Sequence, residues 1–94
     1  MYNGFIFENN NKFYFIPCNY EKKNKTIARS FTNYFISKCN FIPTPEVIEN
    51  TFEIIYKYMY KASVKRSDDF TQYFIRAKYN GAIINENDII FVEI

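Results

Sequence analysis

A small α+β domain is the fold class that this sequence predicts, on three observations. Short runs rich in aromatic and β-branched residues lie toward both ends of the chain, at 2–8, 12–18, 82–84 and 89–94. Between them, apolar residues recur at helical spacing. The 94 residues are enough for one hydrophobic core and too few for two. We therefore expect a single domain over residues 1–94, ordered ββαααββ, with an antiparallel sheet of about four strands and the helices packed on one face.

The first two runs, 2–8 and 12–18, predict a β-hairpin because three turn-forming asparagines, at 9–11, separate them. Strand alternation gives Phe5 and Phe7 a common face, and Phe13 and Phe15 a common face. We expect these four rings to form one aromatic face that packs on the helices. The opposite face then carries Ile6, Tyr14 and Ile16, and it is either covered as well or exposed as an apolar patch.

Residues 19–25 are polar, basic and without periodicity, which indicates a surface loop. From 26 to 40, apolar residues return at helical spacing, at Ile27, Phe31, Tyr34 and Phe35. This stretch predicts a first helix that ends before the break at Pro43.

The stretch 44–66 predicts a long central helix. Its apolar face consists of Ile48, Phe52, Ile55, Met59 and Ala62. A second, water-facing stripe consists of Glu49, Glu53, Lys57, Lys61 and Lys65. Thr44 is expected as the N-cap, with Pro45 in the first helical position.

A third helix is expected from 67 to 79, because Ser67 resembles an N-cap and Asn80-Gly81 a helix stop. The alternative for this segment is a strand, with Tyr73 and Ile75 on one face, that leads into an Asn-Gly hairpin turn. The runs 82–84 and 89–94 then predict a second hairpin around the polar residues 85–88.

Catalytic chemistry finds little support in the sequence. Without any histidine, a Ser-His or Cys-His nucleophilic pair cannot form. Two glycines cannot supply a phosphate-binding loop or a dinucleotide-binding turn. Asp68-Asp69 is explained by a helix start, and residues 85–88 lack the glycine and glutamate of a calcium loop. We therefore expect no enzyme activity, no catalytic residues, no metal and no cofactor.

Cys18 and Cys39 occur without a CxxC motif, and the first ten residues do not resemble a secretory leader. We expect both to remain thiols in a reducing cytoplasm, which is the host cytoplasm if the protein is viral. No apolar run approaches the roughly 18 residues of a membrane span, so no membrane partner is expected.

Basic residues interleaved with aromatic ones form the main candidate site. One group lies in the basic loop and the start of the first helix, residues 19–29, and the other along the lysine stripe of the long helix. A positive groove with stacking rings suits an acidic protein or single-stranded nucleic acid. The candidate partner-binding residues are Tyr14, Tyr20, Lys22, Lys23, Lys25, Arg29, Lys57, Tyr60 and Lys61.

These observations predict a small non-catalytic binding protein that occupies or occludes a macromolecular partner, a protein in preference to nucleic acid. Ile, Asn, Phe, Lys and Tyr, which A/T-rich codons encode, supply more than half of the chain. This bias fits a phage or mobile-element inhibitor of a host defence or nucleic-acid machine, such as an anti-CRISPR-type inhibitor. The alternative is a nucleic-acid-binding or regulatory protein, although a net charge of +2 is far from a strongly basic signature. A homodimer through the same aromatic residues is a further alternative.

Overall fold

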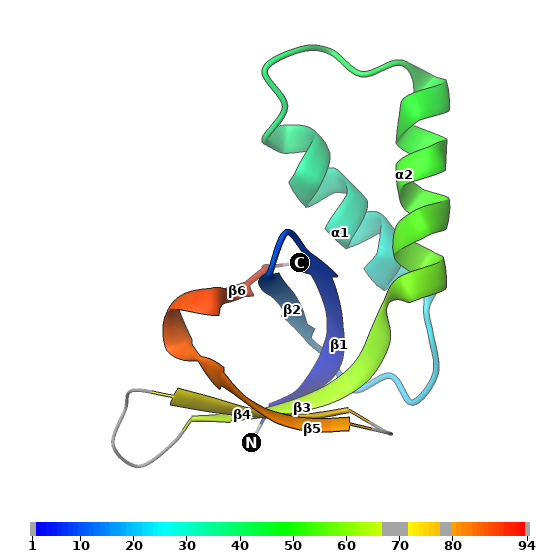
Figure 1. Cartoon of the computed structure of the whole chain (residues 1–94). Helices are drawn as coiled ribbons and strands as arrows, with labels where there is room; N and C mark the ends of the chain where they lie inside the picture. The colour runs from blue at the N-terminus through cyan, green and yellow to red at the C-terminus, as the bar shows by residue number, and fades with distance from the viewer. Residues whose placement is uncertain (1, 67–71, 78–79, 94) are drawn as a thin grey trace.

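The computed structural model describes the backbone of residues 2–66, 72–77 and 80–93, and the side chains of 2–64, 84 and 87–93 (Figure 1). Within these residues, six strands form one mixed sheet in the order β5-β4-β3-β1-β2-β6, accompanied by two helices. The elements are β1 (Tyr2–Asn9), β2 (Lys12–Pro17), α1 (Lys25–Ser37), α2 (Pro45–Tyr58), β3 (Tyr60–Arg66), β4 (Gln72–Ala77), β5 (Asn80–Asn85), the 3₁₀ helix η1 (Glu86–Asp88) and β6 (Ile89–Phe91). The α+β class is confirmed, and the order ββαααββ is wrong.

The first hairpin, β1–β2, is confirmed. Asn10 and Asn11 form its two-residue turn with φ values of 53° and 63°, a left-handed conformation that asparagine tolerates. This turn pairs Phe5 with Ile16 and Phe7 with Tyr14. The expected aromatic face is therefore wrong, because the register puts Phe5 and Phe7 on the same face as Tyr14 and Ile16, and not with Phe13 and Phe15.

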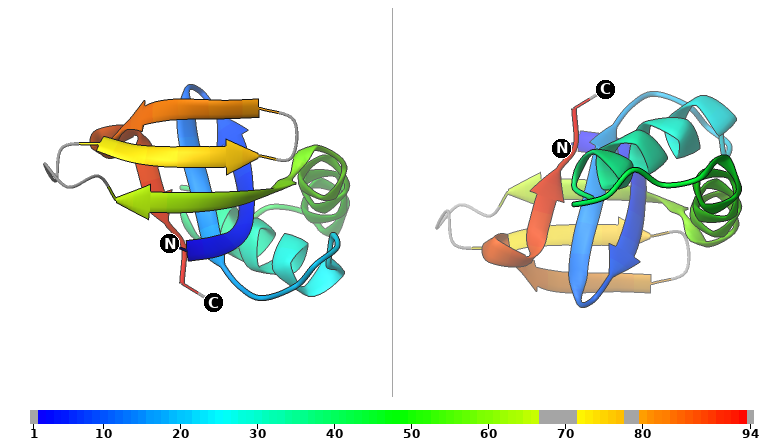
Figure 2. Two further views of the ribbon diagram at one scale, coloured as in Figure 1. Left: turned by 90° about the horizontal axis from the view of Figure 1, so that it is seen from below. Right: turned by 90° about the horizontal axis from the view of Figure 1, so that it is seen from above.

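The sheet is strongly curled, because its two edge strands are joined by the short helix η1. The four steps from Asn85 to Ile89 can span at most roughly 14 Å, whereas the edges of a flat six-stranded sheet lie roughly 24 Å apart. Figure 2 shows the result: β4 and β5 run across β1 and β2. The curl also brings β6 beside β2 in parallel, with Tyr14 opposite Ile90, so an entirely antiparallel sheet is ruled out.

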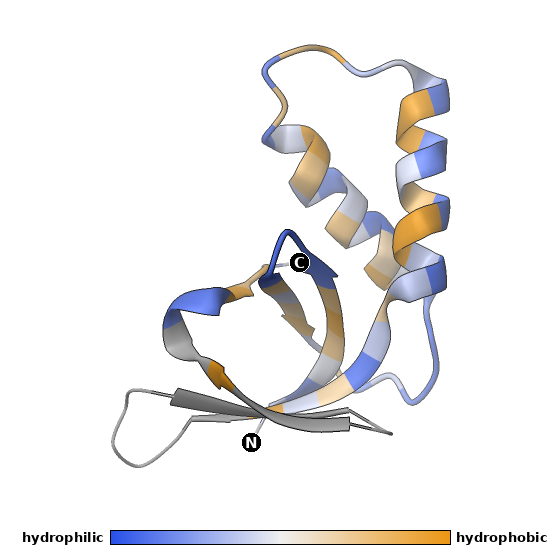
Figure 3. Cartoon of the chain, in the orientation of Figure 1, coloured by the Kyte–Doolittle hydropathy of each residue, from blue (hydrophilic) through white to orange (hydrophobic). Residues whose placement is uncertain are grey.

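Two hydrophobic clusters lie on opposite faces of β1 and β2, where a single core was expected. The inner cluster fills the curl of the sheet, and its buried members are Ile6, Phe15, Ala62, Val64, Ile84 and Ile89. The outer cluster lies between the sheet and the helices, with Phe5, Ile16, Ile27, Ala28, Phe31, Phe52, Ile55, Met59 and Val92 buried. The second face of the hairpin is thus covered as well, and β1 lies between two apolar layers. Figure 3 shows the hydrophobic residues along the middle of β1 and on both helices.

Both helices begin where the sequence predicts and pack on one face of the sheet (Figure 1). Asn24 caps α1 by accepting a hydrogen bond from the Thr26 amide at 2.8 Å. Thr44 caps α2 by accepting one from the Val47 amide at 3.3 Å, with Pro45 in the first turn. The expected burial of Phe52, Ile55 and Met59 is confirmed.

The central helix is shorter than expected, because α2 ends at Tyr58 and the segment 60–66 is strand β3. Ala62 and Val64 are buried at alternate positions of β3, and Val64 pairs with Tyr2 of β1. The segment satisfies both a helical and an alternating pattern. The segment pairs with the edge of β1 that β2 does not occupy, and this pairing makes it a strand.

The expected third helix at 67–79 is wrong where the structure describes it, because 72–77 forms strand β4 and the alternative of a strand is correct. Residues 67–71, which held the expected cap, and 78–79 lie outside the described residues. The aromatic and β-branched run Tyr73-Phe74-Ile75 pairs on both sides, with β3 and β5. The expected second hairpin is wrong as well, since β5 pairs with β4 and β6 with β2.

Gly4 lies where β1 and β2 approach too closely for a side chain. A Cβ atom at this position would overlap the carbonyl oxygen of Ile16 and come within 2.9 Å of Cζ of Phe15. We expect Gly4→Ala to lower the free energy of unfolding by about 1–3 kcal/mol, despite the entropy that alanine removes from the unfolded chain. The measurement is the urea unfolding midpoint, with Glu8→Ala on the same strand as control. Equal midpoints for the two variants would show that the strands can move apart without cost.

Candidate partner-binding site

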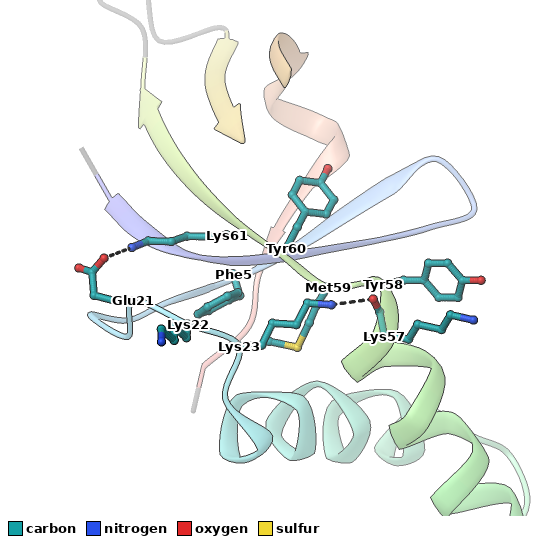
Figure 4. A pocket seen from close by; sticks show the side chains of 9 residues that line it. All are labelled: Phe5, Glu21, Lys22, Lys23, Lys57, Tyr58, Met59, Tyr60 and Lys61. Carbon is teal, nitrogen blue, oxygen red and sulfur yellow. Dashed lines mark hydrogen bonds and ion pairs between the residues drawn. The ribbon is translucent and has the colours of Figure 1, made fainter. Parts of the chain in front are cut away.

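A hollow of about 350 Å³ lies where α2 passes into β3 and the 18–24 loop crosses this junction. We call it the lysine pocket. It is lined by Phe5, Glu21, Lys22, Lys23, Lys57, Tyr58, Met59, Tyr60 and Lys61 (Figure 4). Phe5 and Met59 are buried members of the outer cluster, so the pocket has an apolar floor beneath a mainly basic rim.

Three separate segments bring the four lysines together. Lys22 and Lys23 come from the loop before α1, Lys57 from the last turn of α2, and Lys61 from β3. The chain turns abruptly at Met59, whose amide donates to the Ile55 carbonyl at 2.8 Å while its own backbone is extended. After this turn Lys61 reaches the loop at Glu21, whereas the side chain of Lys57 extends to the other side of the pocket, beside Tyr58 (Figure 4).

Two of the four lysines are occupied by structural contacts. The Lys23 ammonium donates to the carbonyl oxygens of Tyr56 at 3.0 Å and Lys57 at 2.6 Å. It thereby supplies a positive charge at the C-terminus of α2, where the last carbonyls of a helix lack intrahelical donors. Lys61 Nζ lies 2.7 Å from Glu21 Oε2 and ties β3 to the loop.

The other two lysines are available to a ligand. Among the described residues, the ammonium groups of Lys22 and Lys57 have no carboxylate or carbonyl partner. Lys57 Nζ lies 5.4 Å from the ring centroid of Tyr58, whose side chain is 60% exposed. A cation beside an exposed ring offers both charge and flat contact area to an incoming surface.

A second hollow continues from the lysine pocket along α2. Two adjoining cavities, of about 550 and 240 Å³, share Phe7, Asn9 and Ile54 as lining residues. Tyr58 and Tyr60 connect the larger of them to the lysine pocket. We call this continuous depression between α2 and β1 the α2 groove. Its walls are mostly apolar, so positive charge is concentrated at one end of it.

The structure brings together five of the nine residues predicted from sequence, namely Lys22, Lys23, Lys57, Tyr60 and Lys61. The Tyr60 ring, however, packs against the inner cluster and points away from Lys23 in Figure 4. Tyr20 and Lys25 are exposed and lie outside the pocket lining.

The two remaining residues, Tyr14 and Arg29, contribute to the packing of the helices. Tyr14 lies on the helix side of the sheet, against Tyr34 and Phe35, so its expected place on the opposite face is wrong. Arg29 joins α1 to α2: its guanidinium lies 2.9 Å from Glu49 Oε1 and 3.8 Å from the ring centroid of Phe52.

The sequence interpretation overlooked the exposed apolar residues of α2. Val47, Ile54 and Tyr58 recur with Thr51 at spacings of four, three and four, which is a second helical stripe beside the buried one. This spacing is visible in the sequence.

The lysine pocket presents four lysines and one carboxylate, Glu21, and this excess of positive charge can bind an anion. In the part of the chain that the structure describes, no group of three or more candidate metal ligands occurs, and no helix is long and apolar enough to cross a membrane. Cys18 and Cys39 are free. Comparison of the chain with family models, curated proteins and solved structures gave no match.

The neighbouring residues Lys22 and Lys23 allow a matched test of this division of roles. Lys23→Met removes both hydrogen bonds to the C-terminus of α2, and we expect the free energy of unfolding to fall by about 0.5–1 kcal/mol, a modest loss because the group is exposed. Lys22→Met should change it by no more than a few tenths of a kcal/mol. Chemical denaturation followed by circular dichroism measures both. A Lys22→Met variant as unstable as Lys23→Met would contradict the assignment.

Proposed function

We propose that the chain is a small non-catalytic binding protein that occupies an acidic macromolecular partner through the lysine pocket. The observation that carries the proposal is that two uncommitted cations from separate segments, Lys22 and Lys57, line opposite sides of one pocket, with the exposed ring of Tyr58 beside Lys57. Charged residues at the rim of an interface steer encounter, and a neighbouring aromatic side chain supplies contact area.

A protein suits this site better than a nucleic acid. Single-stranded nucleic acid requires a positive track that follows its backbone. Here the four lysines of the site line one pocket that also contains Glu21, and the depression continues into the mostly apolar α2 groove. A protein surface with an acidic patch beside apolar side chains is complementary to this site, in which a basic pocket adjoins an apolar groove.

In its narrower form, the proposal is an inhibitor carried by a phage or mobile element and directed against a host defence or nucleic-acid machine, as in anti-CRISPR-type inhibition. Its support is compositional: a residue usage typical of A/T-rich coding sequence and the absence of histidine-based catalysis. An inhibitor that acts by occupying its target needs no catalytic group.

Single-stranded nucleic acid is the second candidate, favoured by the position of Lys57 beside the ring of Tyr58. An exposed ring can stack on a base while the neighbouring ammonium meets a phosphate. Such a complex would weaken steeply with salt.

Charge reversal at Lys22 tests the proposed site. We expect Lys22→Glu to reduce capture of the partner from a low-GC bacterial lysate by at least about tenfold, because it places a carboxylate opposite an acidic surface. Lys25→Glu is the matched control, since it makes the same change three positions away at an exposed residue outside the pocket lining. Bound protein is quantified by mass spectrometry, with and without nuclease.

Three outcomes of this experiment are informative. Loss of capture in Lys22→Glu alone, unaffected by nuclease, supports a protein partner at the lysine pocket. Loss of capture on nuclease treatment selects the nucleic-acid candidate. Equal capture by the parent and both variants overturns the assignment of the pocket.

A further inference from the structure

Helix α2 displays an apolar stripe that no other element of the described chain covers. The stripe consists of Val47, Thr51, Ile54 and Tyr58, and its three large apolar members are 43%, 53% and 60% exposed. It runs roughly 16 Å along the helix axis at a rise of 1.5 Å per residue. The buried face of the same helix, with Phe52 and Ile55, already satisfies the intramolecular core. The stripe therefore requires a different explanation.

The charges beside the stripe are divided along the helix. On its solvent side, away from the sheet, the flanking positions are Glu46 in the first turn, Asn50 and Glu53 in the middle and Lys57 in the last turn. Along this edge α2 is therefore acidic in its first and middle turns and basic in its last turn. Two such helices packed antiparallel about a twofold axis bring their corresponding edges together in opposite directions. Each Lys57 then lies beside Glu46 of the other copy.

The α1–α2 loop adds apolar surface at the same end of the helix as Glu46. Phe41 and Ile42 are 66% and 95% exposed, and they precede α2 by a few residues. In an antiparallel arrangement, this loop of one copy lies at the C-terminal end of α2 in the other. There the α2 groove is open beside Phe7 and Tyr58. A stable interface buries at least roughly 1,000 Å², more than one helix stripe provides, so the loop and groove supply contact that the stripe alone lacks.

We propose that two copies of this chain associate through α2, antiparallel about a twofold axis. Thr51 and Ile54 lie near the axis, Val47 of each copy faces Tyr58 of the other, and the Glu46–Lys57 contact occurs twice. The interface is isologous, so every favourable contact is repeated. Lys57 and Tyr58 belong to both this interface and the lysine pocket, so the dimer competes with a partner for them, whereas Lys22, in the loop before α1, lies outside the interface.

The first test is oligomeric state. The parent should be a dimer by light scattering and sedimentation at 200 µM, on the order of concentrations at which weak dimers form. Ile54→Asp should raise the dissociation constant of the dimer by at least about a hundredfold, because a carboxylate would be buried near the axis. Asn33→Asp, at an exposed position of α1, adds the same charge elsewhere and should leave the dimer intact. Far-UV circular dichroism checks that both variants remain folded.

The second test addresses the antiparallel geometry. Glu46→Lys and Lys57→Glu should each weaken the dimer by about tenfold through like-charge contact, and the double variant should return to within about threefold of the parent. Restoration in the double variant supports the antiparallel contact, and its absence contradicts that contact. A monomeric parent at 200 µM overturns the proposal, as does a dimer that Ile54→Asp leaves unchanged. Capture by the Lys22 and Lys25 variants is scored separately, so failure of the dimer is distinguishable from failure of the pocket.

Discussion

The rest of the structure depends on the middle of strand β1, where Gly4, Phe5 and Ile6 are buried and neither face of the strand meets solvent. It pairs with β2 on one edge and β3 on the other, and its successive residues Phe5 and Ile6 enter different clusters. A one-residue slip of register would exchange those two side chains between the two clusters. The two-residue turn at Asn10-Asn11 prevents such a slip, because its left-handed backbone fixes which residues of β1 and β2 are opposite. The absence of a side chain at Gly4 lets the two strands approach closely.

This double coverage explains how a short chain keeps so many aromatic residues. Phe15 belongs to the inner cluster, and Phe31 and Phe52 belong to the outer one. With two apolar layers, the molecule hides more rings than a single sheet-and-helix interface could. Among the side chains that the structure describes, five of the eight exposed large hydrophobic residues lie on α2 and the loop before it. A concentration of exposed apolar side chains is typical of an interaction surface.

Features set by neighbouring residues could be predicted from the sequence. The first hairpin and the starts of both helices follow from asparagine, threonine and proline side chains that act on adjacent backbone. The segment 60–66 was assigned to the wrong element because it satisfies two periodicities, and the deciding partner, β1, is distant in sequence. The parallel contact between β2 and β6 has no local signal at all.

The candidate site could likewise be predicted only as far as neighbouring residues determine it. The residue types were predicted, since lysines interleaved with tyrosines are visible in the sequence. Their grouping was not predicted, because the loop residue Lys22 and the helix residue Lys57 line one pocket only after β3 turns back along β1. No local pattern indicates that Arg29 and Tyr14 take part in helix packing, since their partners Glu49 and Phe35 belong to other elements.

The parallel pairing of β2 with β6 also bears on the order of events during synthesis. The amide of Val92 donates to the Phe15 carbonyl at 2.8 Å, and the Val92 side chain completes the outer cluster that β1, β2 and both helices begin. A ribosome therefore releases the hairpin and both helices well before the strand that seals them. Until β6 emerges, one edge of β2 and part of both clusters are accessible to water and to other nascent chains. Folding of this protein is for that reason a late, chain-wide event, with a rate limited by contacts between distant segments.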